Sequence, residues 1–145
     1  MKKNQIILSR TYKSERIVTL SIGFIFFIFG ILKFFPNFSP AEDIAIKTMD
    51  VLTGHVLPSY ISYFLLAVWE TTMGLFLIIN FKQKLTIISA LIHLTLTFSI
   101  FIIFPELSFN KHPFSFTLLG QYIIKNIIIL SVLLSLLTKN NTIND

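Results

Sequence analysis

Four long apolar runs occupy more than half of this chain and constrain its fold more than any other feature. Each is about 20 residues long, the length at which a helix rising 1.5 Å per residue crosses a hydrocarbon core about 30 Å thick. None of the runs alternates apolar with polar residues, as a membrane β-strand would. The sequence therefore predicts an all-α membrane protein. We expect one four-helix transmembrane domain over residues 1–145, with spans at about 17–35, 61–79, 85–104 and 118–137.

Composition agrees with a membrane location and excludes several classes of protein. The chain is 54% hydrophobic and 13% charged, with a mean hydropathy of +0.77, far from the values of a soluble domain. Its net charge of +5 does not indicate nucleic-acid binding, because the basic residues bracket the apolar runs instead of forming a stripe with interleaved aromatic residues. The chain has no cysteine, so any redox role needs a bound cofactor, a quinone or a partner protein.

The distribution of basic residues predicts the orientation of the spans. Lys47 and Lys111 lie at one end of the predicted bundle, and eight basic residues lie at the other: Lys2, Lys3, Arg10, Lys13, Arg16, Lys82, Lys84 and Lys139. By the positive-inside rule, both termini are cytoplasmic. A signal peptide cleaved near Ser39-Pro40-Ala41 is the alternative interpretation. It is disfavoured because the apolar run is longer than a signal core of about 7 to 15 residues.

A short amphipathic helix is predicted in the connection between the first two spans. Ser39 as N-cap, Pro40 at the first helical position and Glu42 three residues after the cap form a capping box, and the helix should end near Thr53-Gly54. The residues of one face, mostly apolar, recur at helical spacing, and they are Ala41, Ala45, Thr48, Met49, Leu52 and Val56. This extracytoplasmic helix either merely covers the bundle or acts as a lid over an outward-opening pocket.

Two of the spans carry opposite charges near their middle, Glu70 in the second and Lys125 in the fourth. A charge in hydrocarbon costs roughly 2.5 to 3.5 kcal/mol on insertion scales, so each charge needs a partner, a watery cavity or a function. Counted from the outer ends of their spans, the two residues lie at nearly the same depth, and we expect them to form one coupled pair. Lys33 lies near the outer end of the first span, where it can reach the interface as an anchor.

Polar neighbours on the fourth span extend this pair into a candidate site. Gln121 lies one turn from Lys125 and points the same way, while Tyr122 and Asn126 form a second such pair beside it. Trp69 is too deep for an interface belt, so it either packs within the bundle or stacks on a ring-shaped ligand. The candidate residues are Glu70 and Lys125 as catalytic groups, with Trp69, Gln121, Tyr122, Asn126 and Lys33 as ligand-binding groups.

His93 lies near the middle of the third span, on a helical stripe with Ala90 and Thr97. A lone histidine in such a place is either hydrogen-bonded across the bundle or a metal ligand, and the first role is the more frequent. Haem held by two histidines is disfavoured, since His55 and His112 both fall in outer connections. We therefore assign no metal site.

Small residues in the first two spans predict close helix packing. Gly23 and Gly30 lie seven positions apart in the first span, and Gly74 lies one turn from Glu70 in the second. Residues without a Cβ let helix backbones approach closely inside a membrane. We therefore expect these two spans to be tightly packed.

Several segments together resemble the DoxX family of small bacterial membrane proteins, over roughly residues 16–137. The segments are Ile22-Gly23-Phe24 to Lys33-Phe34-Phe35-Pro36, Ser39-Pro40-Ala41-Glu42-Asp43, Trp69-Glu70 with Gly74, Phe104-Pro105, and Gly120-Gln121-Tyr122-Ile123-Ile124-Lys125-Asn126. The last is the most specific, because such a polar string inside an apolar helix is improbable by chance. The resemblance implies a multi-pass protein of the bacterial inner membrane. It also implies a link to membrane redox chemistry, since some members are described as subunits of thiosulfate:quinone oxidoreductases or of membrane redox complexes.

Two classes of function follow from these features. In the redox interpretation, an outward pocket binds a quinone or a small sulfur species, and the chain is an accessory subunit of a quinone-linked complex. In the alternative, the chain is a small-solute transporter or a purely structural membrane subunit. The sequence has no flavin, haem or iron–sulfur motif, which argues against a self-sufficient oxidoreductase.

Overall fold

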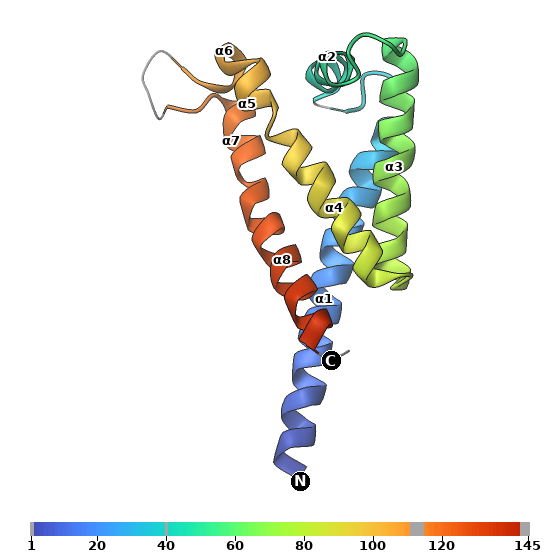
Figure 1. Cartoon of the computed structure of the whole chain (residues 1–145), viewed down its shortest axis with the longest axis vertical. Coiled ribbons are helices and arrows are strands. Elements are labelled where there is room, and N and C mark those ends of the chain that lie inside the picture. Colours follow the sequence, from blue (N-terminus) through green and yellow to red (C-terminus); the bar gives the residue numbers. More distant parts are fainter. Residues whose placement is uncertain (1, 40, 111–114, 143–145) are drawn as a thin grey trace.

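A computed structural model describes residues 2–39, 41–110 and 115–142 of the chain, which fold into helices arranged as a bundle (Figure 1). The helices are α1 (Lys2–Leu32), α2 (Glu42–Leu52), α3 (Ser59–Ile79), α4 (Gln83–Thr97), α5 (Ile100–Ile103), α6 (Pro105–Ser108), α7 (Leu118–Ile124) and α8 (Asn126–Thr142). Four stretches are long and apolar enough to cross a membrane: Tyr12–Leu32, Ser59–Ile79, Gln83–Ile103 and Leu118–Lys139. The prediction of an all-α, four-span membrane bundle is confirmed.

The tightest packing in the bundle is between α1 and α3, and it depends on glycine. A Cβ atom added at Gly74 would lie 2.7 Å from the backbone oxygen of Gly23, and one added at Gly30 would overlap the backbone of Thr71. These distances leave no room for a side chain. The sequence-based expectation of close packing between the first two spans is therefore confirmed, and it fixes the register between α1 and α3.

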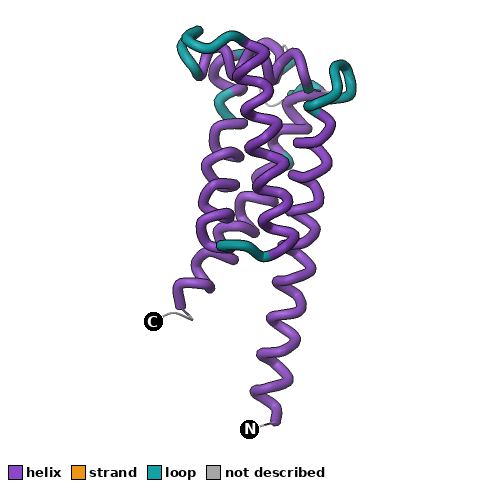
Figure 2. The backbone as a smooth tube through the Cα atoms, turned by 90° about the vertical axis from the view of Figure 1, so that its right-hand side faces the viewer, coloured by secondary structure: helices purple, strands orange, loops and turns teal. Residues whose placement is uncertain are grey.

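Polar contacts close the end of the bundle where both termini lie (Figures 1 and 2). The Arg16 guanidinium donates hydrogen bonds to the carbonyl oxygens of Leu77 and Ile78 at the C-terminal end of α3. The Leu77 oxygen also accepts the backbone amide of Asn80, the C-cap residue. Lys139 of α8 forms an ion pair with Glu15 of α1. These contacts tie three helices together beside the predicted cytoplasmic surface.

The helix of the first span ends earlier in the structure than the sequence predicted. The helix was predicted to continue to Phe35, but α1 ends at Leu32, and residues 33 to 35 continue in turns whose amides bond three residues back. From there the chain passes through Asn37, which adopts a left-handed backbone conformation (φ 66°), and continues to α2. Thus α1 stops within the bundle, well below the outer end of α3 (Figure 1).

The predicted helix after the first span is α2, but its capping is different. Ala41 occupies the N-cap position, without a side-chain cap, because α2 begins at Glu42. The Glu42 carboxylate instead accepts a hydrogen bond from the backbone amide of Asn37, at 2.8 Å. Pro40, predicted as the first helical residue, lies outside the described residues. The C-terminal end agrees with prediction, with Thr53 as C-cap and Gly54 left-handed at φ 63°.

The other outer connection is built from aromatic residues. The third span breaks after α4 at Phe98 and resumes as α5, and the chain then forms α6 before the bridge between Phe109 and Phe116. The Phe101 ring contacts the rings of Phe98, Phe109 and Phe116, with centroids 5.4 to 6.1 Å apart. The aromatic residues of this connection thus form a packed cluster at the outer end, while residues 111–114 lie outside the described part.

Candidate functional site

A cavity of about 160 Å³ lies inside the half of the bundle covered by α2. Its walls come from α1, α3, α4 and the α7–α8 span, and they are largely apolar. Residues of α2 line it as well, namely Ala41 at the N-cap followed by Ile44, Ala45, Thr48, Met49 and Leu52. Ile44 also packs with Ile100 of α5 and Ile123 of α7, so α2 bridges the bundle above the cavity. A cavity therefore lies beneath α2, as the interpretation of this helix as a lid requires.

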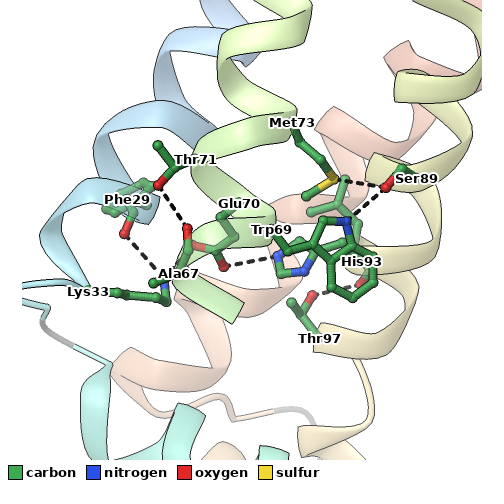
Figure 3. A network of polar contacts seen from close by, with 11 residues as sticks. Phe29, Lys33, Ala67, Trp69, Glu70, Thr71, Met73, Ser89, His93 and Thr97 are labelled. Atoms are coloured by element: carbon green, nitrogen blue, oxygen red, sulfur yellow. Dashed lines mark hydrogen bonds and ion pairs between the residues drawn. The ribbon is translucent and has the colours of Figure 1, made fainter. Parts of the chain in front are cut away.

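A buried polar network built around Glu70 forms one end of the cavity (Figure 3). The Lys33 ammonium lies 2.6 Å from Glu70 Oε2, and Nε2 of His93 lies 3.1 Å from Oε1. The side chains of Lys33, Glu70 and His93 are 10%, 7% and 8% exposed. Both carboxylate oxygens are thus bound, as a buried charge requires. A carboxylate can only accept, so the proton of a neutral His93 belongs on Nε2.

The partner of Glu70 differs from the one that depth alone predicted. Lys125 was expected to pair with Glu70, but Lys33 takes that place. Lys125 is exposed on the surface of its span. Lys33 was expected to lie higher, as an interfacial anchor. The early end of α1 instead brings Lys33 to the level of Glu70, about 16 Å along α3 from Ser59.

His93 is the site residue that the candidate list did not contain. Its predicted hydrogen bond across the bundle is confirmed, and the acceptor is Glu70. The ring lies between the edges of Phe26 and Trp69, with centroids 5.7 and 5.6 Å away, which fixes its orientation. The signal in the sequence was the helical spacing of His93 with Ala90 and Thr97. The structure confirms that this stripe faces inward, since Ala90 is fully buried.

Trp69 lines the cavity with its ring, while its polar edge points to α4. The indole Nε1 donates to Ser89 Oγ at 2.8 Å, and Ser89 Oγ lies 3.3 Å from Met73 Sδ (Figure 3). This bond holds α3 and α4 together beside the network. Packing within the bundle, one of the two roles considered for Trp69, is therefore observed, and the ring remains at the cavity wall.

The fourth span contributes one of its two predicted polar pairs to the cavity. Tyr122 and Asn126 line it, and within the described residues neither the Tyr122 hydroxyl nor the Asn126 amide has a hydrogen-bond partner. Gln121 and Lys125 do not line it; both are exposed on another face of the span, and Lys125 lies 5.6 Å from the centroid of the Tyr122 ring. The expectation that Gln121 and Lys125 face the same site as Tyr122 and Asn126 is therefore wrong, because the rotation of the helix separates the two pairs.

The cavity is only partly enclosed. Four of its lining residues are also exposed at the surface, at 40% or 41%: Ile25 of α1, Leu52 of α2, Leu96 of α4 and Tyr122 of α7. The rings of Phe29 and Tyr122, which both line the cavity, meet edge to face with centroids 6.2 Å apart. Because Ile25, Leu96 and Tyr122 belong to membrane spans, the cavity borders on the surface that faces lipid.

Beyond the network, the half of the bundle nearer the termini holds an apolar core, and a second cavity of about 170 Å³ lies there between α3 and α4. The buried members of the core are Ile22, Phe26, Met73, Leu77, Ile87, Ala90, Leu94, Leu133 and Leu136. Trp69 lines both cavities. The apolar core lies between the Glu70 network and the predicted cytoplasmic end. We refer to the cavity beneath α2 as the chamber.

Comparisons with protein-family models, with curated proteins and with solved structures find no match for this chain. Its four apolar helices identify it as an integral membrane protein. What it does must be argued from the cavity and from the residues that surround it.

Proposed function

We propose that this protein is a DoxX-type subunit of a bacterial inner-membrane redox complex, in which it binds the ring of a quinone. The observation that carries the proposal is the Lys33–Glu70–His93 network, buried at one end of an apolar chamber that borders on the surface facing lipid. A purely structural bundle gains little from two charges in its interior, because their desolvation offsets most of their attraction. Such residues in a membrane span mark functional sites by default.

The residues around the chamber suit a molecule with one polar ring and an apolar tail. A cavity of about 150 Å³ holds a single benzene-sized ring, so a volume of about 160 Å³ fits one ring, and the tail would lie outside the chamber. The Tyr122 hydroxyl and the Asn126 amide are both able to donate hydrogen bonds to carbonyl oxygens. Lys33, Glu70 and His93 are groups that hold and exchange protons, which quinone chemistry consumes and releases together with electrons.

The assignment as an accessory subunit follows from what the chain supplies. It offers proton-holding groups and a binding chamber, but its sequence has no cysteine and no flavin, haem or iron–sulfur motif. Electrons would come from a partner protein. We therefore assign the chain to ligand binding and proton handling, with Glu70 as the central group.

A small-solute transporter is the second candidate, and the largely apolar lining of the chamber makes it the weaker one. A chamber that borders on the lipid-facing surface at Ile25 and Tyr122 favours an apolar ligand over a water-soluble solute.

Ligand-dependent stabilisation of the purified full chain tests the proposal. A short-tailed ubiquinone analogue should raise the melting temperature in detergent, since a ligand at 100 times its Kd stabilises by about 2.7 kcal/mol. A menaquinone analogue, whose head group has two fused rings, should raise it less. Ala45→Phe, which adds a ring on the cavity face of α2, should abolish the shift. Lys47→Phe, on the exposed face of the same helix, is the matched control and should leave it intact. A melting temperature that responds to neither analogue, or that shifts equally in both variants, would overturn the proposal.

A further inference from the structure

The α7–α8 span presents a polar stripe to its surroundings. Six of its exposed residues recur every three or four positions: Leu118, Gln121, Lys125, Ile128, Ser131 and Ser135. Tyr122, Ile127, Leu134 and Thr138 are exposed beside them. The span is also the least buried of the four. Every other span exposes mainly apolar residues at membrane depth, as with Phe64, Leu65 and Val68 of α3. Among the described residues, Lys125 is the exposed charge deepest within a span.

The charge of Lys125 is not balanced within the chain. The described carboxylates inside the spans are Glu15, paired with Lys139, and Glu70, paired with Lys33. The Tyr122 ring, 5.6 Å from the ammonium, offers a cation–π contact of roughly 0.5 to 2 kcal/mol. Exposure of a lysine to hydrocarbon costs roughly 2.5 to 3.5 kcal/mol or more, so this contact does not balance it. An external anion is needed.

We infer that the stripe is the docking face for a transmembrane helix of a different protein, which carries an aspartate or glutamate opposite Lys125. Gln121, Ser131 and Ser135 add the small and hydrogen-bonding side chains that pack membrane helices against each other. This inference extends the accessory-subunit part of the proposed function, but it does not depend on what the chamber binds.

A second copy of the chain is a poor occupant for this face. Two copies inserted in the same orientation are related by an axis along the membrane normal, which brings residues of equal depth face to face. Their Lys125 ammonium groups would then repel each other, and each chain's carboxylates inside the spans are already paired. A lipid phosphate is also poorly placed. Lys125 lies about 10 Å along the helix from Leu118, so contact with a headgroup requires the lysine side chain to extend toward the interface or the bilayer to thin.

Site-directed photo-crosslinking in membranes of the native host tests the inference. A benzophenone amino acid replaces Ile128 in the stripe, and in a control protein it replaces Val68 on the exposed face of α3, at a similar distance from the outer end of its helix. We expect Ile128 to yield one discrete adduct with another membrane protein, and Val68 to yield none of that mass. The crosslinked peptide should map to a transmembrane helix that contains an acidic residue.

Charge exchange then distinguishes docking from mere proximity. Lys125→Glu should reduce the adduct at least about tenfold, Lys125→Arg should retain it, and Lys125→Glu combined with an acidic-to-lysine change in the partner should restore it. An adduct of twice the chain mass, adducts with lipid alone, equal labelling from Val68, or no effect of Lys125→Glu would each overturn the inference. Thermal shifts with quinone analogues read the chamber separately, so failure here is distinguishable from failure of the proposed function.

Discussion

The Lys33 ammonium lies 2.6 Å from the Glu70 carboxylate, although Lys33 directly follows the last residue of α1 and Glu70 lies in the middle of α3. The contact exists because α1 ends inside the bundle, and the close packing of Gly30 on Thr71 sets its register against α3. The early end of α1 also leaves room beneath α2 for the chamber. One feature of the fold thus creates both the ion pair and the space in front of it.

We predict that Lys33 and Glu70 behave as one coupled unit. Glu70→Gln or Lys33→Met alone strands a buried group and should cost about 3 to 5 kcal/mol, whereas the double variant should cost clearly less than the sum. A double-mutant cycle on unfolding in detergent measures the coupling. Lys125→Met is the control, and its effect should add to that of Glu70→Gln. Additive effects of the Lys33 and Glu70 variants would mean that the pair is absent.

The sequence predicted features that depend on length and periodicity. Four apolar runs, the small residues Gly30 and Gly74, and the amphipathic pattern around Ala45 and Thr48 are strong local signals, and the structure agrees with each. Predictions of this kind hold because the hydrocarbon thickness sets the length of a membrane helix and the 3.6-residue period sets which face is buried.

The identity of the Glu70 partner could not be predicted in the same way. The depth of Lys33 was counted from an assumed helix end at the membrane surface, whereas α1 ends lower. The rotation of the fourth span was inferred from its polar residues, but packing decides it: Gly120 lies against the backbone of Ser108 and Ile123 is buried. These contacts turn Tyr122 toward the chamber and Lys125 away from it. They join residues, such as Gly120 and Ser108, whose proximity cannot be inferred from a single sequence.

Gly74 should be far more sensitive to substitution than its neighbour on the opposite face of α3. Gly74→Leu would push a side chain into the backbone of α1 at Phe27, and we expect it to cost about 3 kcal/mol or to prevent folding. Thr72→Leu, at an exposed position of the same helix, should stay within about 0.5 kcal/mol. Melting in detergent compares the two variants. Equal stability would contradict the observed approach of α1 and α3.

The charge distribution predicts that both termini and the α3–α4 connection face the cytoplasm. The chain has no native cysteine, so single cysteines can report orientation directly. Cysteines at Asn37 and Asn110 should react with a membrane-impermeant thiol reagent in whole cells, and one at Gln83 should react only after the cells are opened. Labelling of Gln83 in intact cells would reverse the orientation.

Trp69 should report ligand binding without any added label. It is the only tryptophan in the chain, and its ring lies at the chamber wall, 5.6 Å from the His93 ring. A bound quinone would lie in contact with the indole and accept an electron from its excited state. Titration with a short-tailed quinone analogue should therefore quench the fluorescence saturably.

Two variants of the fourth span separate binding in the chamber from collisions in detergent. Asn126→Leu removes an unpaired amide from the chamber wall and should weaken the saturable quenching about tenfold, because one hydrogen bond contributes about 1 kcal/mol and more when its acceptor is left unpaired. Gln121→Leu makes a similar change on an exposed face of the span that does not line the chamber, and it should leave the quenching curve unchanged. Quenching that rises linearly with concentration, or that falls equally in both variants, would show that the ring does not enter the chamber.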